Sequence, residues 1–444
     1  MAQAKRTKLF FVVSLITLIG LFVPGGASQA AADDPVELVA TRQTIFIAGD
    51  EGTGIHIPPP ENFSNLAPAT ANIVVNFIGS WNAQAQNAFN YAVNIWETQI
   101  DSNITIKIDA EWDNLGPNIL GGAGPLTYYR DGGGLPQSGT WYPVALANTL
   151  TNSDLNGGNA EIGATFNSGF SDWYFGTDGN TPFNKWDFVS VVLHEIGHGL
   201  GFSDSFAYSG GVGSYGLGTP YPVIYDRFVE NGSGQVLINA YGNFTTALGG
   251  QLTSNNVFFG GDIATVANSS GRPKLYAPNP WQGGSSIAHL DESTFNGTPN
   301  ALMTPAINNG ESIHSPGNVT LGIFEDMSWS TALVTNNAPN IVGFPSHMLL
   351  VNTSKNHATD LWAFVSDESS DNLLDFSIVN SPNPSAGVTL DVNDNVDVYP
   401  ATDWTGITTV IVEVEDPEGL TSSGSFSVSV VDQIIPLYLP ISTR

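Results

Sequence analysis

Residues 187 to 204 read Asp-Phe-Val-Ser-Val-Val-Leu-His-Glu-Ile-Gly-His-Gly-Leu-Gly-Phe-Ser-Asp, and this stretch decides how the chain is interpreted. Its valine-rich beginning alone would also suit a buried strand. Asp187 is a good N-cap, however, and Gly201 supplies a stop, so the pattern predicts a helix. Within that helix, His194 and His198 are four residues apart, which places both imidazoles on one side.

The pattern His194-Glu195-x-x-His198 points to a zinc site. In a chain with 7 histidines, chance predicts about 0.004 such matches. Two histidines and a carboxylate are also costly to bury on an apolar helix without a cation. Zinc held by imidazoles leaves a position for water and lowers the pKa of that water toward about 7. Glu195 is then placed to take the proton and pass it to a leaving amine, so the pattern predicts peptide hydrolysis without a covalent intermediate.

A zinc site with one open position needs a third protein ligand. The run from His194 to Gly201, followed later by Ala301-Leu302-Met303-Thr304-Pro305, resembles the metzincin zinc peptidases. In most metzincins the third ligand lies three residues beyond the glycine, which here is Asp204, and the snapalysins use aspartate there. The resemblance implies a Met-turn in which Met303 forms an apolar floor beneath the site without binding the metal.

The chain also resembles the leishmanolysin group, which has Gly-Phe after the second histidine's turn and a long insertion before the third ligand. That resemblance implies His289 as the third ligand and residues 203–288 as an insertion subdomain over the cleft. We favour His289 over Asp204, because imidazole is the commoner zinc ligand. The likeness covers about residues 70 to 330. Leishmanolysins are rich in cysteine and this chain has none, so their latency cannot be carried across.

Charge and composition restrict the partners. Against 12 Lys and Arg stand 41 Asp and Glu, and the formal charge of -29 argues against nucleic-acid partners. With no cysteine, any metal must bind His, Asp or Glu. Besides Zn2+, Ca2+ is a candidate cofactor at acidic loops such as 178–180 or in the C-terminal region. His314 is a reserve ligand without a partner pattern.

The N-terminus predicts export. Residues 1–30 combine basic, apolar and small-residue segments in the order of a secretory signal peptide, and no later stretch is long enough to span a membrane. The protein is therefore expected outside the cytoplasm, secreted or at the cell surface. Residues 31–70 have the composition of a pro-segment or a linker, and the sequence does not decide between them.

The remaining chain predicts an α+β metzincin-like catalytic domain, with a mixed sheet and a zinc-binding helix, followed by an all-β sandwich. The catalytic domain is expected at 71–335. Its strands are expected around 73–78, 104–108 and 161–166, the last at a sheet edge, with a helix around 85–96 and a glycine-rich interruption at 116–134. Period-two runs predict an immunoglobulin-like or cadherin-like sandwich at 336–432 and a tail at 433–444.

We therefore expect a secreted zinc endopeptidase that acts on protein or peptide substrates. The alternative is a cell-surface binding or adhesive protein, in which the peptidase-like domain is a scaffold and the sandwich binds an extracellular ligand. An intact Glu195 argues against the alternative, because a scaffold needs no general base.

Overall fold

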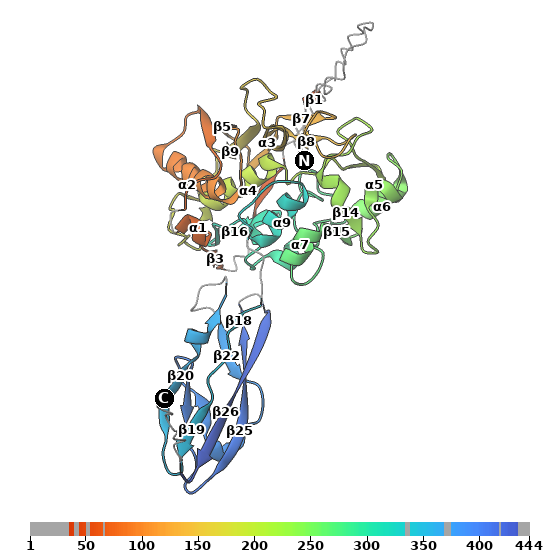
Figure 1. The fold of residues 1–444 in the computed structure, drawn as a ribbon. Coiled ribbons are helices and arrows are strands. Elements are labelled where there is room, and N and C mark those ends of the chain that lie inside the picture. The colour runs from red at the N-terminus through yellow and green to blue at the C-terminus, as the bar shows by residue number, and fades with distance from the viewer. Residues whose placement is uncertain are drawn as a thin grey trace, which may run out of the picture.

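The computed structural model describes residues 35–39, 44–49, 54–64, 67–333, 338–367, 374–416 and 419–433. The signal peptide predicted at 1–30, the domain boundary predicted near 336 and nearly all of the predicted tail lie outside these residues. Buried apolar side chains form two separate clusters, one between Leu38 and Leu333 and one between Ile341 and Val430. The first belongs to a mixed α/β unit and the second to a β unit (Figure 1). Within the described ranges, no helix has the length and apolar character needed to cross a membrane.

The first unit is built on a six-stranded mixed sheet with the strand order β16-β2-β6-β9-β5-β4. Strands β4, β5 and β9 run parallel, β6 is antiparallel to β9, and β2 is antiparallel to β6 and parallel to β16. The strands expected around 73–78, 104–108 and 161–166 are present with shifted ends. The six strands are β2 (Phe46–Gly49), β4 (Ile73–Gly79), β5 (Ile106–Asp113), β6 (Ile119–Pro125), β9 (Ile162–Asn167) and β16 (Ala306–Asn308).

The expectation that 161–166 forms an edge strand is wrong, because β9 lies between β5 and β6. Its neighbour β6 comes from the glycine-rich region, whose composition favours loops. Packing explains the glycines. A methyl group at Gly121 would lie 3.3 Å from the ring of Phe166 and 3.4 Å from Cγ of Glu195. Strand β6 therefore lacks a side chain at Gly121, where the helix at Phe188–Leu200 lies against the sheet.

Two long helices pack together on this sheet. Helix α2 (Ala83–Gln99) begins at the cap Asn82, and α4 (Phe188–Leu200) begins at the cap Asp187, whose side chain accepts a hydrogen bond from the amide of Ser190. Every residue of α4 is buried, as expected for a helix that is largely apolar all round. Trp96 of α2 donates its indole N–H to the carbonyl of Leu193 at 2.9 Å, which joins the two helices.

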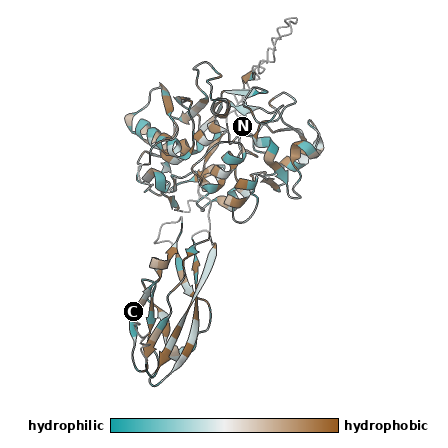
Figure 2. Cartoon of the chain, viewed as in Figure 1, coloured by the Kyte–Doolittle hydropathy of each residue, from teal (hydrophilic) through white to brown (hydrophobic). Residues whose placement is uncertain are grey.

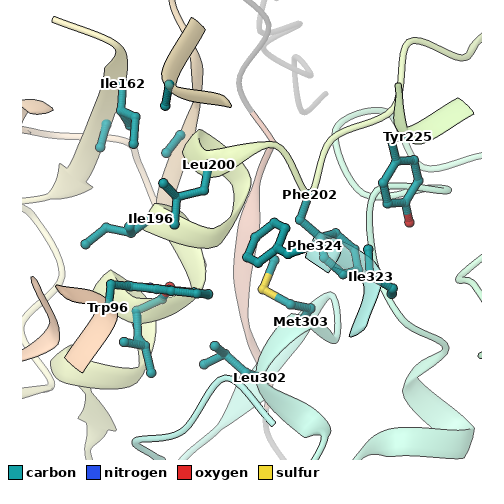
Figure 3. Packing of buried hydrophobic residues seen from close by; sticks show 14 of the residues in the cluster. Trp96, Ile162, Ile196, Leu200, Phe202, Tyr225, Leu302, Met303, Ile323 and Phe324 are labelled. Carbon is teal, nitrogen blue, oxygen red and sulfur yellow. The ribbon is translucent and has the colours of Figure 1, made fainter. Parts of the chain in front are cut away.

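The core continues on both sides of α4 (Figure 3). Ile162 of β9 lies near Ile196 and Leu200, while Met303 and Phe324 lie on the other side. Residues 203–288, predicted as an insertion subdomain, contribute buried aromatic residues to this same cluster. The other helices are α1 (Glu61–Ser64), α3 (Val144–Thr151), α5 (Leu237–Ala240), α6 (Thr246–Leu252), α7 (Asp262–Ala267), α8 (Glu292–Phe295) and α9 (Asn318–Asp326).

Short strands complete the first unit. Strand β1 pairs with β7, and β3 pairs with β17. The short strands are β1 (Val36–Val39), β3 (His56–Ile57), β7 (Thr127–Arg130), β8 (Tyr142–Pro143), β10 (Trp173–Tyr174), β11 (Trp186–Asp187), β12 (Ala207–Ser209), β13 (Val212–Ser214), β14 (Val229–Asn231), β15 (Val257–Phe259) and β17 (Ser312–Ile313).

The second unit is a β-sandwich, with a four-stranded sheet β19-β26-β25-β22 and a three-stranded sheet β20-β24-β23. Hydropathy alternates along its strands (Figure 2), and Val410, Val412 and Val414 point inward as predicted. The strands are β18 (Asn340–Ile341), β19 (His347–Leu350), β20 (Lys355–Asp360), β21 (Val365–Ser366), β22 (Asp375–Ile378), β23 (Val388–Leu390), β24 (Asn395–Val398), β25 (Gly406–Glu415) and β26 (Thr421–Val431).

Candidate metal centre

Three histidines that are far apart in the sequence converge on one point inside the first unit. Their Nε2 atoms are separated by 2.9 Å between His194 and His198, 3.2 Å between His198 and His289, and 3.3 Å between His194 and His289. Three nitrogens around a tetrahedral zinc ion lie about 3.3 Å from one another. The spacing of the three nitrogens therefore suits a single metal ion.

The other ring nitrogen of each histidine fixes the direction of the lone pairs. Nδ1 of His194 faces the carbonyl of Leu302 at 2.6 Å, Nδ1 of His198 that of Phe202 at 2.7 Å, and Nδ1 of His289 that of Ser285 at 2.7 Å. A carbonyl only accepts, so Nδ1 carries the proton and donates it. Each neutral ring then presents an Nε2 lone pair to the other two. Such a cluster of lone pairs is unfavourable without a cation between them, and the donor set fits zinc.

Burial keeps these rings in the state that a metal needs. Loss of solvation lowers the pKa of His194 and His198 well below the ordinary value, and lowers that of His289 to about 4. The neighbouring histidines lower the pKa values of His194 and His198 further. The imidazoles are therefore neutral near pH 7 and available as ligands.

Local structure explains how each ring is placed. His194 and His198 lie one turn apart on α4. Gly201 ends the helix with φ 126°, so the chain turns back and brings the carbonyl of Phe202 to His198. His289 comes from the loop before α8, and the amide of the next residue, Leu290, donates to the carbonyl of Met303 at 2.8 Å. The third histidine is thereby tied directly to the turn at 301–303.

Asp204, the other predicted third ligand, is not part of this cluster. Its Oδ1 accepts a hydrogen bond from the amide of Phe206 at 2.5 Å, and its charge helps to raise the pKa of the neighbouring Asp226. Within the described residues, the metal-competent group at this site consists of His194, His198 and His289. The arrangement places His289, and not Asp204, with the two histidines of α4.

Glu195 follows the first histidine on α4 and lies against β6. Both carboxylate oxygens are buried, and neither makes a hydrogen bond of ordinary geometry. Burial raises the pKa of Glu195 well above its ordinary value, and the backbone amide of Ala123 offsets part of this shift. An unsatisfied buried carboxylate is costly, so its position beside three converging imidazoles needs a chemical reason.

Met303 belongs to a 3-10 turn at Ala301–Met303 that lies under the helix. A side chain at Gly197 would come within 2.9 Å of its sulfur, so the missing side chain makes room for Met303 (Figure 3). The turn has a second role that sequence reasoning missed. The carbonyl of Leu302 accepts the hydrogen bond that orients His194. No sequence signal identifies this contact, because the acceptor is a backbone atom.

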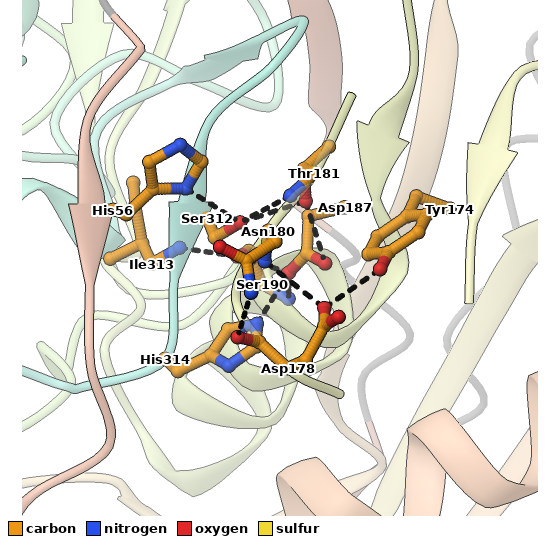
Figure 4. Close-up of polar contacts among 10 residues, drawn as sticks. All are labelled: His56, Tyr174, Asp178, Asn180, Thr181, Asp187, Ser190, Ser312, Ile313 and His314. Atoms are coloured by element: carbon orange, nitrogen blue, oxygen red, sulfur yellow. Dashed lines mark hydrogen bonds and ion pairs between the residues drawn. The ribbon is translucent and has the colours of Figure 1, made fainter. Parts of the chain in front are cut away.

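A buried polar network holds the beginning of α4 (Figure 4). Asp187 accepts from the amide and hydroxyl of Ser190 at 2.8 and 2.6 Å, from the hydroxyl of Thr181 at 3.2 Å, and pairs with Nε2 of His314 at 2.9 Å. His314, the reserve ligand, therefore serves the helix cap and lies outside the histidine cluster. The hydroxyl of Ser312 joins Thr181 to this network at 2.7 Å.

The loop suggested for calcium, 178–180, forms a hydrogen-bonded turn in which Asp178 accepts from Tyr174 and from the amide of Asn180. Calcium there stays a prediction. In the sandwich, His357 lies beside Asp391 and Asp397, and these three form the second group of the described residues that could hold a metal ion. His357 is exposed and pairs with Asp391 at 3.0 Å, so an ordinary ion pair accounts for this group.

Phe46 is a site residue that sequence reasoning missed altogether. Its ring stacks on the ring of His194, with the centroids 3.7 Å apart and an interplanar angle of 8°. Phe46 belongs to β2, a four-residue strand in the segment whose role the sequence leaves open. The short strand gives no periodicity that would have signalled it.

No protein-family model matches the chain, and no curated protein matches it. Over 22% of its length it is similar to protocadherin gamma B7 cadherin domains, with 18% identity, a TM-score of 0.19 and coverage of 25% of that chain. Over 21% it is similar to the human desmocollin-1 ectodomain, with 19% identity, a TM-score of 0.17 and 20% of that chain covered. Over 24% it is similar to a SusE-like surface located polysaccharide binding protein of Bacteroides thetaiotaomicron, with 17% identity, a TM-score of 0.16 and 17% of that chain covered. The matches thus span a quarter or less of these structures, and at these TM-scores they carry no argument about function.

Proposed function

We propose that the first unit is a zinc-dependent endopeptidase that hydrolyses peptide bonds. One observation carries the proposal: three neutral imidazoles direct their Nε2 lone pairs at one point, beside a buried carboxylate that makes no hydrogen bond of ordinary geometry. Zinc is the metal that best suits three imidazole ligands with an open position. The mixed sheet, the helix α4 and the turn at Met303 are compatible with the metzincin resemblance.

Each residue would have a distinct part in this reaction. His194, His198 and His289 would hold the ion, which when bound supplies a Lewis acid and lowers the pKa of water. Glu195 would take a proton from the attacking water on a carboxylate oxygen and deliver it to the nitrogen of the leaving amine. The carbonyls of Leu302, Phe202 and Ser285 keep the rings in the tautomer that can bind metal.

The test compares wild type with Glu195→Gln, which keeps the size of the side chain but removes the base. Zinc content is measured in both, together with hydrolysis of casein by the intact chain. Hydrolysis is also measured after the chain has been cut between Gly49 and Gly54, because β2 ends at Gly49 and its Phe46 stacks on His194. We expect about one zinc per chain in both proteins and hydrolysis reduced by about 100-fold or more in the variant. Glu325→Gln, in α9, is the control and should hydrolyse at the wild-type rate. A well-folded wild type without zinc, or equal hydrolysis by the Glu195 variant, would defeat the proposal.

The second candidate is a cell-surface binding or adhesive protein that uses the sandwich. The observation in its favour is an exposed apolar row across the four-stranded sheet. Met348 and Ile407 are 61% and 69% exposed, and both lie beside Ser429 in the strand register. This candidate predicts no difference between wild type and Glu195→Gln in any assay.

A further inference from the structure

The candidate site is closed in the intact chain. His194, Glu195, His198 and His289 are each 0% exposed, although a peptidase must admit an extended peptide to its metal and base. One element that covers them is β2, whose Phe46 stacks on His194. It lies in the sheet between β6, which passes Glu195, and β16, which follows the turn at Met303. Strand β2 precedes most of this unit in the sequence, yet it lies beside the candidate site.

The segment is held by main-chain hydrogen bonds on both sides. The amide and hydroxyl of Thr44 donate to the carbonyl of Ala123 at 3.0 and 2.9 Å. On the other side, the amide of Ile45 donates to the carbonyl of Gly284 at 3.1 Å, and the hydroxyl of Ser285 donates to the carbonyl of Ile45 at 3.4 Å. Ser285 is also the residue whose carbonyl orients His289. The segment therefore bridges β6 and the loop that carries the third histidine.

Two close approaches show how tightly the segment fits. The ring of Phe46, 2% exposed, stacks on His194. A side chain at Gly284 would come within 3.0 Å of Ile45, so this loop glycine leaves room for the segment. Extended peptides bind protein sheets in the same way, through main-chain hydrogen bonds to a strand edge with side chains in flanking pockets.

We propose that residues 44–49 form a built-in inhibitor that occupies the peptide-binding cleft along β6 and keeps the enzyme latent. This inference rests on the proposed peptidase function. The chain has no cysteine, so a thiolate cannot block the metal. Here the ring of Phe46, which belongs to the paired strand β2, covers the site by stacking on His194. The sequence left open whether 31–70 is a pro-segment or a linker, and the position of β2 favours the pro-segment.

Activation then requires hydrolysis of a peptide bond between Gly49 and Gly54, by another proteinase or another copy of this chain. One water molecule is added across the bond, which leaves a carboxylate on the released segment and an amine on the new N-terminus. After the cut, the chain before it is held only by noncovalent contacts. Among the described residues, these are chiefly the pairing of β1 with β7 and of β2 with its neighbours. Strand β3 stays with the catalytic unit through its pairing with β17.

The experiment places a recognition sequence for a site-specific protease between Gly49 and Gly54 of the otherwise complete, zinc-loaded chain. Two rates are measured before and after cutting: removal of zinc by a chelator, and hydrolysis of casein. Release of the N-terminal fragment that contains β1 and β2 is followed by mass spectrometry after gel filtration. A second variant adds Phe46→Ala, which weakens binding of the cut segment. Val39→Ala, at a position of β1 that is 69% exposed, is its matched control.

We expect both rates to rise by about 100-fold when the segment leaves, because a tethered segment competes at an effective concentration in the millimolar range. Phe46→Ala should raise both rates partly even without cutting, and Val39→Ala should not. Release of the segment with both rates unchanged would overturn the inference and leave the peptidase proposal standing. Faster chelation without hydrolysis in any form would instead overturn the peptidase proposal, while the segment would still be the cover of the metal site.

Discussion

At the scale of single residues, the sequence offers two candidates for the third ligand, His289 and Asp204. We predict that His289→Ala lowers zinc affinity by about 100-fold or more, since loss of a residue that merely orients a ligand already costs about 10- to 100-fold. Asp204→Asn should keep zinc at the wild-type level, because this carboxylate bonds to Phe206 away from the cluster. Competition with a chromophoric chelator measures both affinities. Zinc lost from the Asp204 variant but kept by the His289 variant would reassign the site.

Asp226 provides a pH dependence that is independent of the metal. Burial, and then the charge of Asp204, raise its pKa to about 7, above the value of about 3.9 in an unfolded chain. The folded protein therefore binds the extra proton. This proton uptake adds to the unfolding free energy. Its contribution is fully present below about pH 4 and is lost as the pH rises through 7, at no more than about 1.4 kcal/mol per pH unit.

Urea unfolding of Asp226→Asn should show a shallower fall in the unfolding free energy between pH 4 and 7 than wild type. The variant should also be less stable at low pH, because its amide cannot accept all three hydrogen bonds that Asp226 accepts from Ser205 and Val223. The exposed carboxylate variant Asp101→Asn is the control. An unchanged pH slope in the Asp226 variant would contradict the raised pKa.

At the scale of elements, the cap residue of α4 also belongs to a buried polar network. We predict that Asp187→Ala lowers the unfolding free energy by about 3 kcal/mol. It removes the cap, worth about 1 kcal/mol. It also takes away the partner of Nε2 of His314 and the acceptor for the hydroxyls of Thr181 and Ser190 in a buried network. Asn82→Ala removes the exposed cap of α2, with one hydrogen bond at 2.8 Å, and should cost only about 1 kcal/mol. Equal losses in denaturant unfolding would show that the network adds nothing.

The same elements show which parts of the site could be predicted. Helix α4, with its cap, its histidines and Glu195, is encoded locally, because four-residue spacing on one helix fixes which side chains share a face. The sandwich could also be anticipated, because valines at every second position place their side chains on one face of a strand. Strand β6 could not, since its glycines favour a loop and only the folded structure shows that Gly121 leaves room for Phe166 and Glu195.

Long-range contacts limited the rest of the prediction. The position of β9 inside the sheet depends on β6, so the error about one led to the error about the other. His289 could be ranked above Asp204 only by ligand chemistry and resemblance, because 91 residues separate it from His198. Phe46 gave no signal at all, since only the folded sheet brings β2 to the metal site.

At the scale of the whole molecule, the two hydrophobic clusters contain no common residue, so the two units should unfold separately. We predict two calorimetric transitions for the full chain. Under the proposed function, zinc binds only the folded first unit. A metal present at about 1,000 times its Kd adds about 4 kcal/mol, or about 10 °C for a unit of this size. Chelation should therefore lower one transition by that amount and leave the other in place.

A core substitution in the sandwich assigns the two transitions. Val412 is fully buried on β25, so Val412→Ala should destabilise the sandwich by about 2 kcal/mol or more and lower only its transition. That transition should be the one that chelation leaves unchanged. If chelation and Val412→Ala lowered the same transition, the metal site and the sandwich would form one cooperative unit. The sandwich would then stabilise the catalytic unit, whereas two independent shifts leave it free to act as a binding module attached to a self-sufficient enzyme.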